Sequence, residues 1–404
     1  MLRVWFSTTA FANYIIQNTV IRNQQYQLSE LYESDANNPK KFHTIPDHIK
    51  KILYLDAPDL IIEYDNEPIC SIEISQEAGT GHNAFQRFPR IAASVENNVP
   101  SLYIYPEGIV VSRQRMKDKW DKLNPNIFMA LERAMQIYDV PALLFYFPTD
   151  YGTSPTAYPR TKGKIMDSRF PSCPDSSNSE MQKLFETVNL IVNRTLTASR
   201  RTTLLQERLV TNRRVWMQSQ YTLKGGVAGH GSPITATKTI DTTLLINYLK
   251  KFSPNCNPTF LTGRANTVVY NVDAGIRGDP YPGVLAALDY LMCRRGHTYE
   301  DRDMNLVLAW GIADTSSSGA LVINSSKPNN SVNDFIEKVK VVSQGRNKSL
   351  LGKTFSQLKA ASDIPRYYLH LRYGSTFTKP KEIRCYAYFA DAILFHDGAL
   401  WREG

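Results

Sequence analysis

Residues 58–75 read PDLIIEYDNEPICSIEIS, and this stretch decides how the chain is expected to fold. Residues 59–64 are mostly apolar, residues 65–68 have the composition of a turn, and residues 69–75 alternate apolar and polar side chains. Two short runs of this kind on either side of a turn predict a β-hairpin. Because alternate residues of a strand face the same side, one face of the second strand should be polar. That face carries Ser71, Glu73 and Ser75.

The predicted hairpin brings two carboxylates near one another. Asp59 starts the first strand and Glu73 lies on the second, so antiparallel pairing can place them side by side. Mg²⁺ prefers oxygen ligands and is commonly held by one or two carboxylates together with water and phosphate. A metal ion held in this way assists phosphodiester hydrolysis by neutralising charge and activating water. We therefore expect Asp59 and Glu73 to share Mg²⁺, for which Mn²⁺ can substitute.

The segments around the hairpin predict a mixed α/β fold. Residues 1–57 have apolar positions at helical spacing and are expected to be mainly helical. After the hairpin we expect a loop, then a helix over residues 88–97 with Pro89 in its first turn, and then a buried strand over residues 101–105. Further helices are expected over 126–138, 179–193, 240–252, 282–295 and 331–342, and further strands over 142–146, 303–311, 319–324 and within 366–400.

The motif Pro58-Asp59, the hairpin, Glu73-x-Ser75 and the helix and strand that follow resemble the PD-(D/E)XK nuclease superfamily, to which many type II restriction endonucleases belong. The resemblance covers residues 45–106, about a sixth of the chain. It implies a restriction-endonuclease-like core, which is a central mixed β-sheet flanked by helices. It also implies one or two Mg²⁺ ions held by Asp59 and Glu73, and cleavage of the phosphodiester by water.

The sequence departs from this family at one position, because Ser75 stands where the family has a lysine. A lysine there would stabilise developing charge, whereas a serine can only hydrogen-bond a water molecule. Three interpretations stay open. Gln86, Arg87 or Arg90 supplies the missing group from the following helix, Glu77 contributes instead, or the site is inactive. In several branches of the superfamily a Gln on the corresponding helix touches the active site, and Gln86 is the Gln of this helix.

The charge balance favours a polyanionic partner. The chain carries 47 Lys and Arg against 38 Asp and Glu, a net charge of +9. Residues 194–214 are basic and residues 224–231 are rich in glycine, so either could contact DNA phosphates. The alternatives are a solvated basic helix face and a plain surface loop. The candidate DNA-binding residues are Arg87, Arg90, Arg200, Arg201 and Lys224.

The length of 404 residues indicates two domains. Residues 148–178 are rich in Pro, Ser, Thr and Gly and mark a boundary. We expect a nuclease core with N-terminal helices over residues 1–165, and a second mixed α/β domain for DNA recognition or dimerisation over residues 166–404. Residues 390–394 echo residues 58–62 without an acidic strand after them, which we interpret as a coincidence of strand patterning.

The remaining features indicate a soluble, cytoplasmic protein. The five cysteines form no C-x-x-C pair, which fits a reducing compartment without structural zinc. The N-terminus does not resemble a signal peptide, and no apolar stretch is long enough to span a bilayer.

The sequence therefore predicts a Mg²⁺-dependent DNA endonuclease of the type II restriction kind, acting on double-stranded DNA as a homodimer. A companion DNA methyltransferase is a further candidate partner. Two other hypotheses are an inactive nuclease-fold protein that binds DNA and a metal-dependent nuclease acting on RNA. The bland alternative for Asp59 and Glu73 is a pair of exposed charges on a solvated sheet face.

Overall fold

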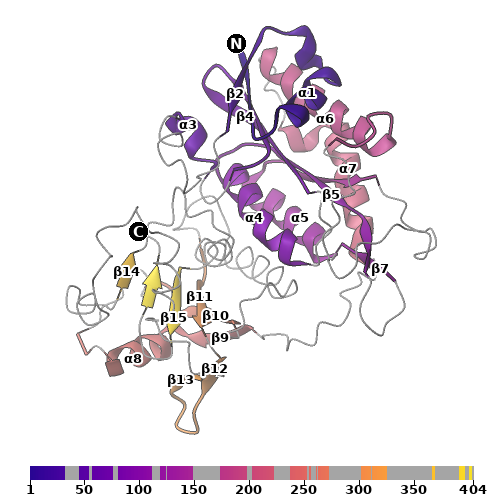
Figure 1. The fold of residues 1–404 in the computed structure, drawn as a ribbon. Coiled ribbons are helices and arrows are strands. Elements are labelled where there is room, and N and C mark those ends of the chain that lie inside the picture. Colours follow the sequence, from indigo (N-terminus) through magenta and orange to yellow (C-terminus); the bar gives the residue numbers. More distant parts are fainter. Residues whose placement is uncertain are drawn as a thin grey trace. The chain divides into compact units, whose positions relative to one another are not determined.

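The computed structural model describes two compact units, each with its own six-stranded sheet (Figure 1). The first unit comprises Met1–Glu33 with Asn38–Gly231, and the second comprises Ser34–Asn37 with Ser232–Gly404. The residues described are 1–31, 45–53, 57–75, 81–111, 119–123, 125–148, 173–197, 203–222, 237–252, 254–255, 261, 263–272, 302–310, 312–324, 366–368, 391–395 and 400–402.

The sheet of the first unit is mixed. Its strand order is β2-β1-β3-β4-β5-β8. Strand β3 runs antiparallel to both of its neighbours, while the pairs β1–β2, β4–β5 and β5–β8 are parallel. The strands are β1 (Leu2–Phe6), β2 (Tyr26–Glu30), β3 (Leu60–Tyr64), β4 (Glu67–Ile74), β5 (Ser101–Pro106) and β8 (Ala142–Phe147).

Helices cover both faces of this sheet (Figure 1). Helices α4 (Gly81–Glu96) and α5 (Asn126–Tyr138) lie on one face, and α1 (Thr9–Gln17) and α6 (Ser179–Leu196) lie on the other. Helix α7 (Arg208–Ser219) packs against β8 and α5. The smaller elements of the unit are η1 (Val20–Asn23), α3 (Asp47–Lys50), the hairpin β6 (Gly108–Val111) with β7 (Lys119–Lys122), η2 (Leu204–Gln206) and η3 (Gln220–Thr222).

The structure confirms the predicted α/β class with a mixed sheet flanked by helices, and it confirms the hairpin. The connection between β3 and β4 is the pair Asp65-Asn66, both with positive φ, 49° and 64°. Two-residue hairpin turns need positive φ at both positions, and Asp and Asn tolerate it better than most residues. The predicted strand over 101–105 and the predicted helix over 126–138 are also confirmed.

Two predictions about the elements were wrong. The N-terminal segment is not mainly helical, because Leu2–Phe6 forms a buried strand inside the sheet and Tyr26–Glu30 pairs with it. Helix α4 begins at Gly81, so Pro89 lies in its interior and not in its first turn. An interior proline removes one hydrogen bond and crowds the preceding turn, and the burial of Phe88, Ile91 and Val95 on the helix face offsets this cost.

The second unit is built on a sheet of order β14-β16-β15-β11-β10-β9. Its core includes Leu245, Leu249, Val269, Val307 and Leu394. Its elements are β9 (Thr237–Asp241), α8 (Thr242–Phe252), β10 (Asn266–Val272), β11 (Asn305–Trp310), the hairpin β12 (Ile312–Thr315) with β13 (Leu321–Asn324), β14 (Arg366–Tyr368), β15 (Ala392–Phe395) and β16 (Leu400–Arg402). The helices expected over 282–295 and 331–342 lie outside the described residues.

The division between the units lies at Gly231–Ser232, further along the chain than the expected boundary at 165/166. Helices α6 and α7 belong to the first unit because both pack against β8. In the part of the chain that the structure describes, no helix has the length and apolar character needed to cross a membrane.

Candidate active site between β3, β4 and α4

The hairpin register brings Asp59 opposite Glu73. Leu60 pairs with Ile72 and Ile61 pairs with Ser71, so the next position outward places Asp59 across from Glu73. On the other side of β4, the parallel register places Tyr103 of β5 beside Glu73. Neighbours in register share a face of the sheet, so these three side chains lie under helix α4.

Asp59 is half-buried and held in place by two hydrogen bonds. The backbone N–H of Ile74 donates to its Oδ2 at 2.8 Å, and the Ser7 hydroxyl donates to its Oδ1 at 3.2 Å. A carboxylate has about four acceptor positions, so each oxygen keeps capacity for a further ligand. These bonds orient the carboxylate and leave it able to bind a cation.

Glu73 is buried, with 1% of its surface exposed, so the alternative of a solvated charge on an open sheet face is wrong for this residue. Two guanidinium groups from α4 approach its Oε1. Arg90 donates from Nη1 at 2.5 Å, and Arg87 places Nε at 3.0 Å. The other oxygen, Oε2, is buried and has no hydrogen-bond partner among the residues that the structure describes, so it is the carboxylate oxygen available to a further ligand.

A polar strip on α4 matches the polar face of β4. Residues 87, 90 and 94 lie three and four positions apart, so they share one helix face. Below the two arginines, the Ser71 hydroxyl donates to Ser94 Oγ at 2.8 Å and lies 3.1 Å from Ser101 Oγ. The sequence signal for this packing is the combination of a polar helix face with a polar strand face, and neither stretch shows it alone.

The electrostatics of the cluster are set by burial. Burial raises the pKa of Glu73 to about 8, Arg90 and Arg87 act to lower this pKa, and the nearby Asp59 charge raises it. Burial alone would lower the pKa of Arg87, but the Glu73 carboxylate raises it above its ordinary value. Burial also raises the pKa of Tyr103 well above its ordinary value, so its phenol stays protonated. The Tyr103 hydroxyl is buried and has no hydrogen-bond partner among the described residues. It was not among the residues predicted from sequence.

The two carboxylates fit a single hard cation. Asp59 and Glu73 face each other, and Glu73 Oε2 is a buried oxygen without a partner. Within the described residues, no group of three or more His, Cys, Asp and Glu side chains could hold a metal ion. One or two carboxylates suffice for Mg²⁺, because water and substrate phosphate complete its coordination.

Of the other predicted site residues, the structure describes Ser75 in full and Gln86 only in its backbone. Ser75 is fully buried at the end of β4, where its N–H donates to the carbonyl of Ile104. Gln86 lies on α4, but its side chain is outside the described residues. Glu77, Arg200, Arg201 and Lys224 are outside the described residues altogether.

Three described arginines of the basic stretch 194–214 are held in ion pairs within the first unit, whereas Arg208 is exposed. Arg194 pairs with Glu207 at 2.9 Å, Arg213 with Glu180 at 2.6 Å, and Arg214 with Glu132 at 2.5 Å. Arg213 is also buried, with its guanidinium 3.5 Å from the ring centroid of Trp216. These contacts contradict the alternative of a solvated basic face for Arg213.

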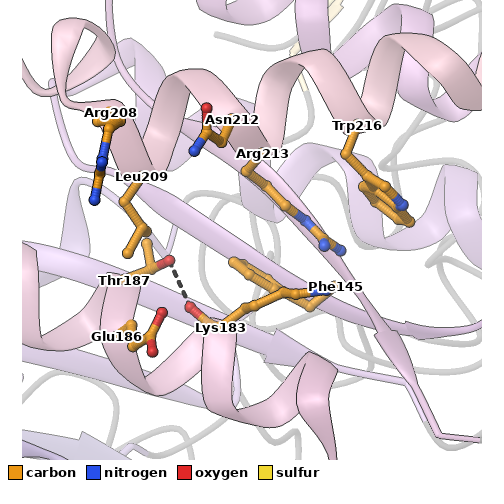
Figure 2. Close-up of a pocket in the computed structure, with 9 residues that line it drawn as sticks. All are labelled: Phe145, Lys183, Glu186, Thr187, Arg208, Leu209, Asn212, Arg213 and Trp216. Carbon is orange, nitrogen blue, oxygen red and sulfur yellow. Dashed lines mark hydrogen bonds between the residues drawn. The ribbon is translucent and has the colours of Figure 1, made fainter.

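A pocket of about 400 Å³ lies between α6, α7 and β8 (Figure 2). The strand register puts Leu144 on the face of Glu73, so Phe145, which lines the pocket, is on the other face. Helices α6 and α7 form its walls and Phe145 of β8 forms its floor. Its charged lining residues are Lys183, Glu186, Arg208 and Arg213, and Arg213 is already paired with Glu180. This pocket is separate from the carboxylate pair.

Comparison of the chain with protein-family models, with curated proteins and with solved structures gave no match.

Proposed function

We propose that this chain is a metal-dependent endonuclease that hydrolyses phosphodiester bonds at a specific sequence of double-stranded DNA, in the manner of a type II restriction endonuclease. The observation that carries the proposal is the placement of Asp59 opposite Glu73 with two guanidinium groups from α4 at the same carboxylate. The order of hairpin, helix and parallel strand around this pair is the order that the family resemblance implies. The net charge of +9 suits a polyanionic substrate.

The residues of the site divide the chemistry between them. Asp59 and Glu73 would hold Mg²⁺ or Mn²⁺, which when bound supplies charge neutralisation and an activated water. Arg87 and Arg90 bring the positive charge that Ser75 lacks, and they do so from the helix. Fixed cations beside a reacting phosphate stabilise the charge that develops on its oxygens. Tyr103 keeps a neutral O–H that can donate a hydrogen bond within the site.

A second candidate is a DNA-binding protein with an inactive nuclease fold. The observation that favours it is the enclosure of Glu73, which is 1% exposed and already faces two cations. In that case the ion pairs would serve the stability of the fold, and the protein would bind DNA without cutting it.

The test is incubation of plasmid DNA with the full chain and Mg²⁺. We expect discrete fragments, and sequencing of their ends gives the target and the cut position. Glu73→Gln and Asp59→Asn should abolish cutting and leave salt-sensitive DNA binding largely intact. Glu132→Gln is the matched control, because Glu132 is also buried and paired with an arginine but lies on α5.

The remaining outcomes separate the alternatives. Retained DNA binding without cutting in Mg²⁺ or Mn²⁺ would favour the inactive DNA-binding protein, and preference for RNA would favour an RNA nuclease. Wild-type cutting by Glu73→Gln would show that the site lies elsewhere. Cutting both strands requires two sites, so we also propose a homodimer on DNA, with the second unit serving recognition or dimerisation. Sizing the complex on a duplex tests this.

A further inference from the structure

The two arginines at Glu73 are held differently. Arg90 is 9% exposed and donates an aligned hydrogen bond to Glu73 Oε1. Arg87 is 19% exposed, and its Nε lies 3.0 Å from the same oxygen without the alignment of a hydrogen bond. The Nε of Arg87 is buried and has no hydrogen-bond partner among the described residues. Arg87 is therefore the more accessible and the less firmly held of the two.

The charges around Glu73 disfavour a cation while both arginines are in place. Glu73 and Asp59 together carry two negative charges when ionised, and Arg87 and Arg90 carry two positive charges. A divalent cation at Glu73 Oε2 would meet both guanidinium groups across a single carboxylate, in a buried place where charges are weakly screened. Moving one guanidinium away would leave a net negative site that attracts the cation.

A phosphodiester offers Arg87 a better partner than it has now. Arginine presents five donors in a planar fork that matches two phosphate oxygens, and such bidentate contacts are among the stronger hydrogen bonds. Against Glu73, Arg87 has proximity but no aligned hydrogen bond. Arg90 can stay on Glu73 and keep Oε1 satisfied during the exchange.

We infer that Arg87 is the phosphate-binding residue of this site, and that a DNA phosphate takes Arg87 away from Glu73, which frees Glu73 for the divalent cation. The inference rests on the proposed function. Its consequence is that DNA and the cation bind cooperatively, each raising the affinity of the other. Linkage requires the same factor in both directions, and couplings of this kind are about 5- to 150-fold.

The first measurement is Mn²⁺ binding to the free full-length protein, followed by the loss of the free Mn²⁺ signal in electron paramagnetic resonance. We expect Arg87→Gln and Arg87→Met to bind Mn²⁺ more tightly than wild type, by a factor in the range of about 5 to 150. Arg87→Lys keeps the charge and should stay close to wild type. Arg133→Gln is the matched control, because Arg133 is a half-buried helix arginine on α5 that donates a hydrogen bond to Gln136 at 3.4 Å and lies outside the candidate site.

The second measurement gives a decisive result on wild type alone, even where a variant fails to fold. The affinity of wild type for a dye-labelled mixed-sequence duplex is measured by fluorescence anisotropy in EDTA and in Mn²⁺ at constant ionic strength. We expect Mn²⁺ to tighten DNA binding by wild type and by Arg133→Gln, and to have little effect on Arg87→Gln.

The results distinguish this inference from the proposed function. If Glu73→Gln abolishes Mn²⁺ binding while Arg87→Gln binds Mn²⁺ no more tightly than wild type, the metal site stands and the inference is overturned. Equal DNA affinity of wild type in EDTA and in Mn²⁺ also overturns it. If Glu73→Gln binds Mn²⁺ as well as wild type does, the carboxylate site itself is wrong and the proposed function fails with it.

Discussion

Asp59 and Asp391 occupy the same position relative to a strand. Each lies immediately before a strand, β3 or β15, and each accepts a backbone N–H from a neighbouring strand at 2.8 Å, from Ile74 and Leu306 respectively. Asp391 is paired with Arg302 at 2.5 Å. An aspartate at a strand start is thus explained by backbone hydrogen bonding alone. What makes Asp59 a candidate ligand is the carboxylate of Glu73 opposite it.

Introducing at position 75 the lysine of the nuclease motif that the sequence resembles should not raise cleavage. Ser75 is fully buried, and the positive charge at Glu73 already comes from Arg87 and Arg90. We expect Ser75→Lys to lower the free energy of unfolding by about 1–3 kcal/mol through overpacking, and not to raise cleavage. Urea unfolding and a plasmid assay check both parts. Faster cleavage by this variant would show that the helix arginines do not replace the lysine.

At the level of residues, the sequence predicts part of the site and not the rest. The position of Asp59 opposite Glu73 follows from the alternation of side chains along a strand and from the short turn between the strands. Both features can be read from neighbouring residues in the sequence. The contacts of Arg87 and Arg90 with Glu73 depend on where α4 begins and how it lies on the sheet. Those features are set by packing between segments about fifteen residues apart, which no local pattern encodes.

At the scale of elements, an ion pair closes the open edge of the sheet at β8. Arg213 donates to the carbonyl of Leu144 from Nε and Nη2, at 2.8 and 2.6 Å, and it pairs with Glu180. Glu180 Oε2 accepts the N–H of Tyr146 at 3.1 Å. The pair therefore satisfies the outward backbone groups that a neighbouring strand would otherwise bind. A run of arginines in the sequence does not distinguish this role from contact with DNA.

Removing the arginine should expose this edge. We expect Arg213→Met to lower the free energy of unfolding by about 3 kcal/mol, because it leaves Glu180 and the carbonyl of Leu144 without their partner in a buried place. Arg133→Met is the control, and its effect should be small. A loss below the experimental error for Arg213→Met would mean that β8 does not depend on the ion pair. Urea midpoints at pH 7 measure the difference.

The ion pair between Arg213 and Glu180 also makes the stability of the fold depend on pH. Burial alone would raise the pKa of Glu180, but hydrogen bonds and charge from Arg213 lower it below its ordinary value. A carboxyl whose pKa is lower in the folded state stabilises the fold above its unfolded pKa, and this contribution is lost as the pH falls. We expect Glu180→Gln to be less stable than wild type at pH 7, and this difference to shrink toward pH 3. Glu186→Gln, an exposed acid on the same helix, should show no such trend. A pH-independent difference for Glu180→Gln would contradict the assignment.

At the scale of the whole molecule, the candidate site lies entirely within the first unit. Asp59, Glu73, Arg87, Arg90 and Tyr103 all belong to it. The first unit includes α6 and α7. Both helices come after residues 148–178, the stretch rich in Pro, Ser, Thr and Gly that was predicted to be a domain boundary. That stretch is followed by two helices of the same unit and is therefore not a boundary between units. A composition rich in Pro and Gly predicts irregular structure, but it does not show where a hydrophobic core ends.

This arrangement predicts how truncated chains behave. A fragment of residues 1–231 keeps the six-stranded sheet and the helices on both of its faces, so we expect it to unfold cooperatively and to bind Mn²⁺ through Asp59 and Glu73. A fragment of residues 1–165 loses α6 and α7, which uncovers the apolar face of β4 and β8 and the edge that Arg213 closes. We expect that fragment to aggregate or to lack a cooperative transition, as followed by circular dichroism and urea unfolding. If 1–165 unfolds cooperatively while 1–231 does not, the core of the first unit is smaller than its contacts indicate, and the boundary near residue 165 is the better one.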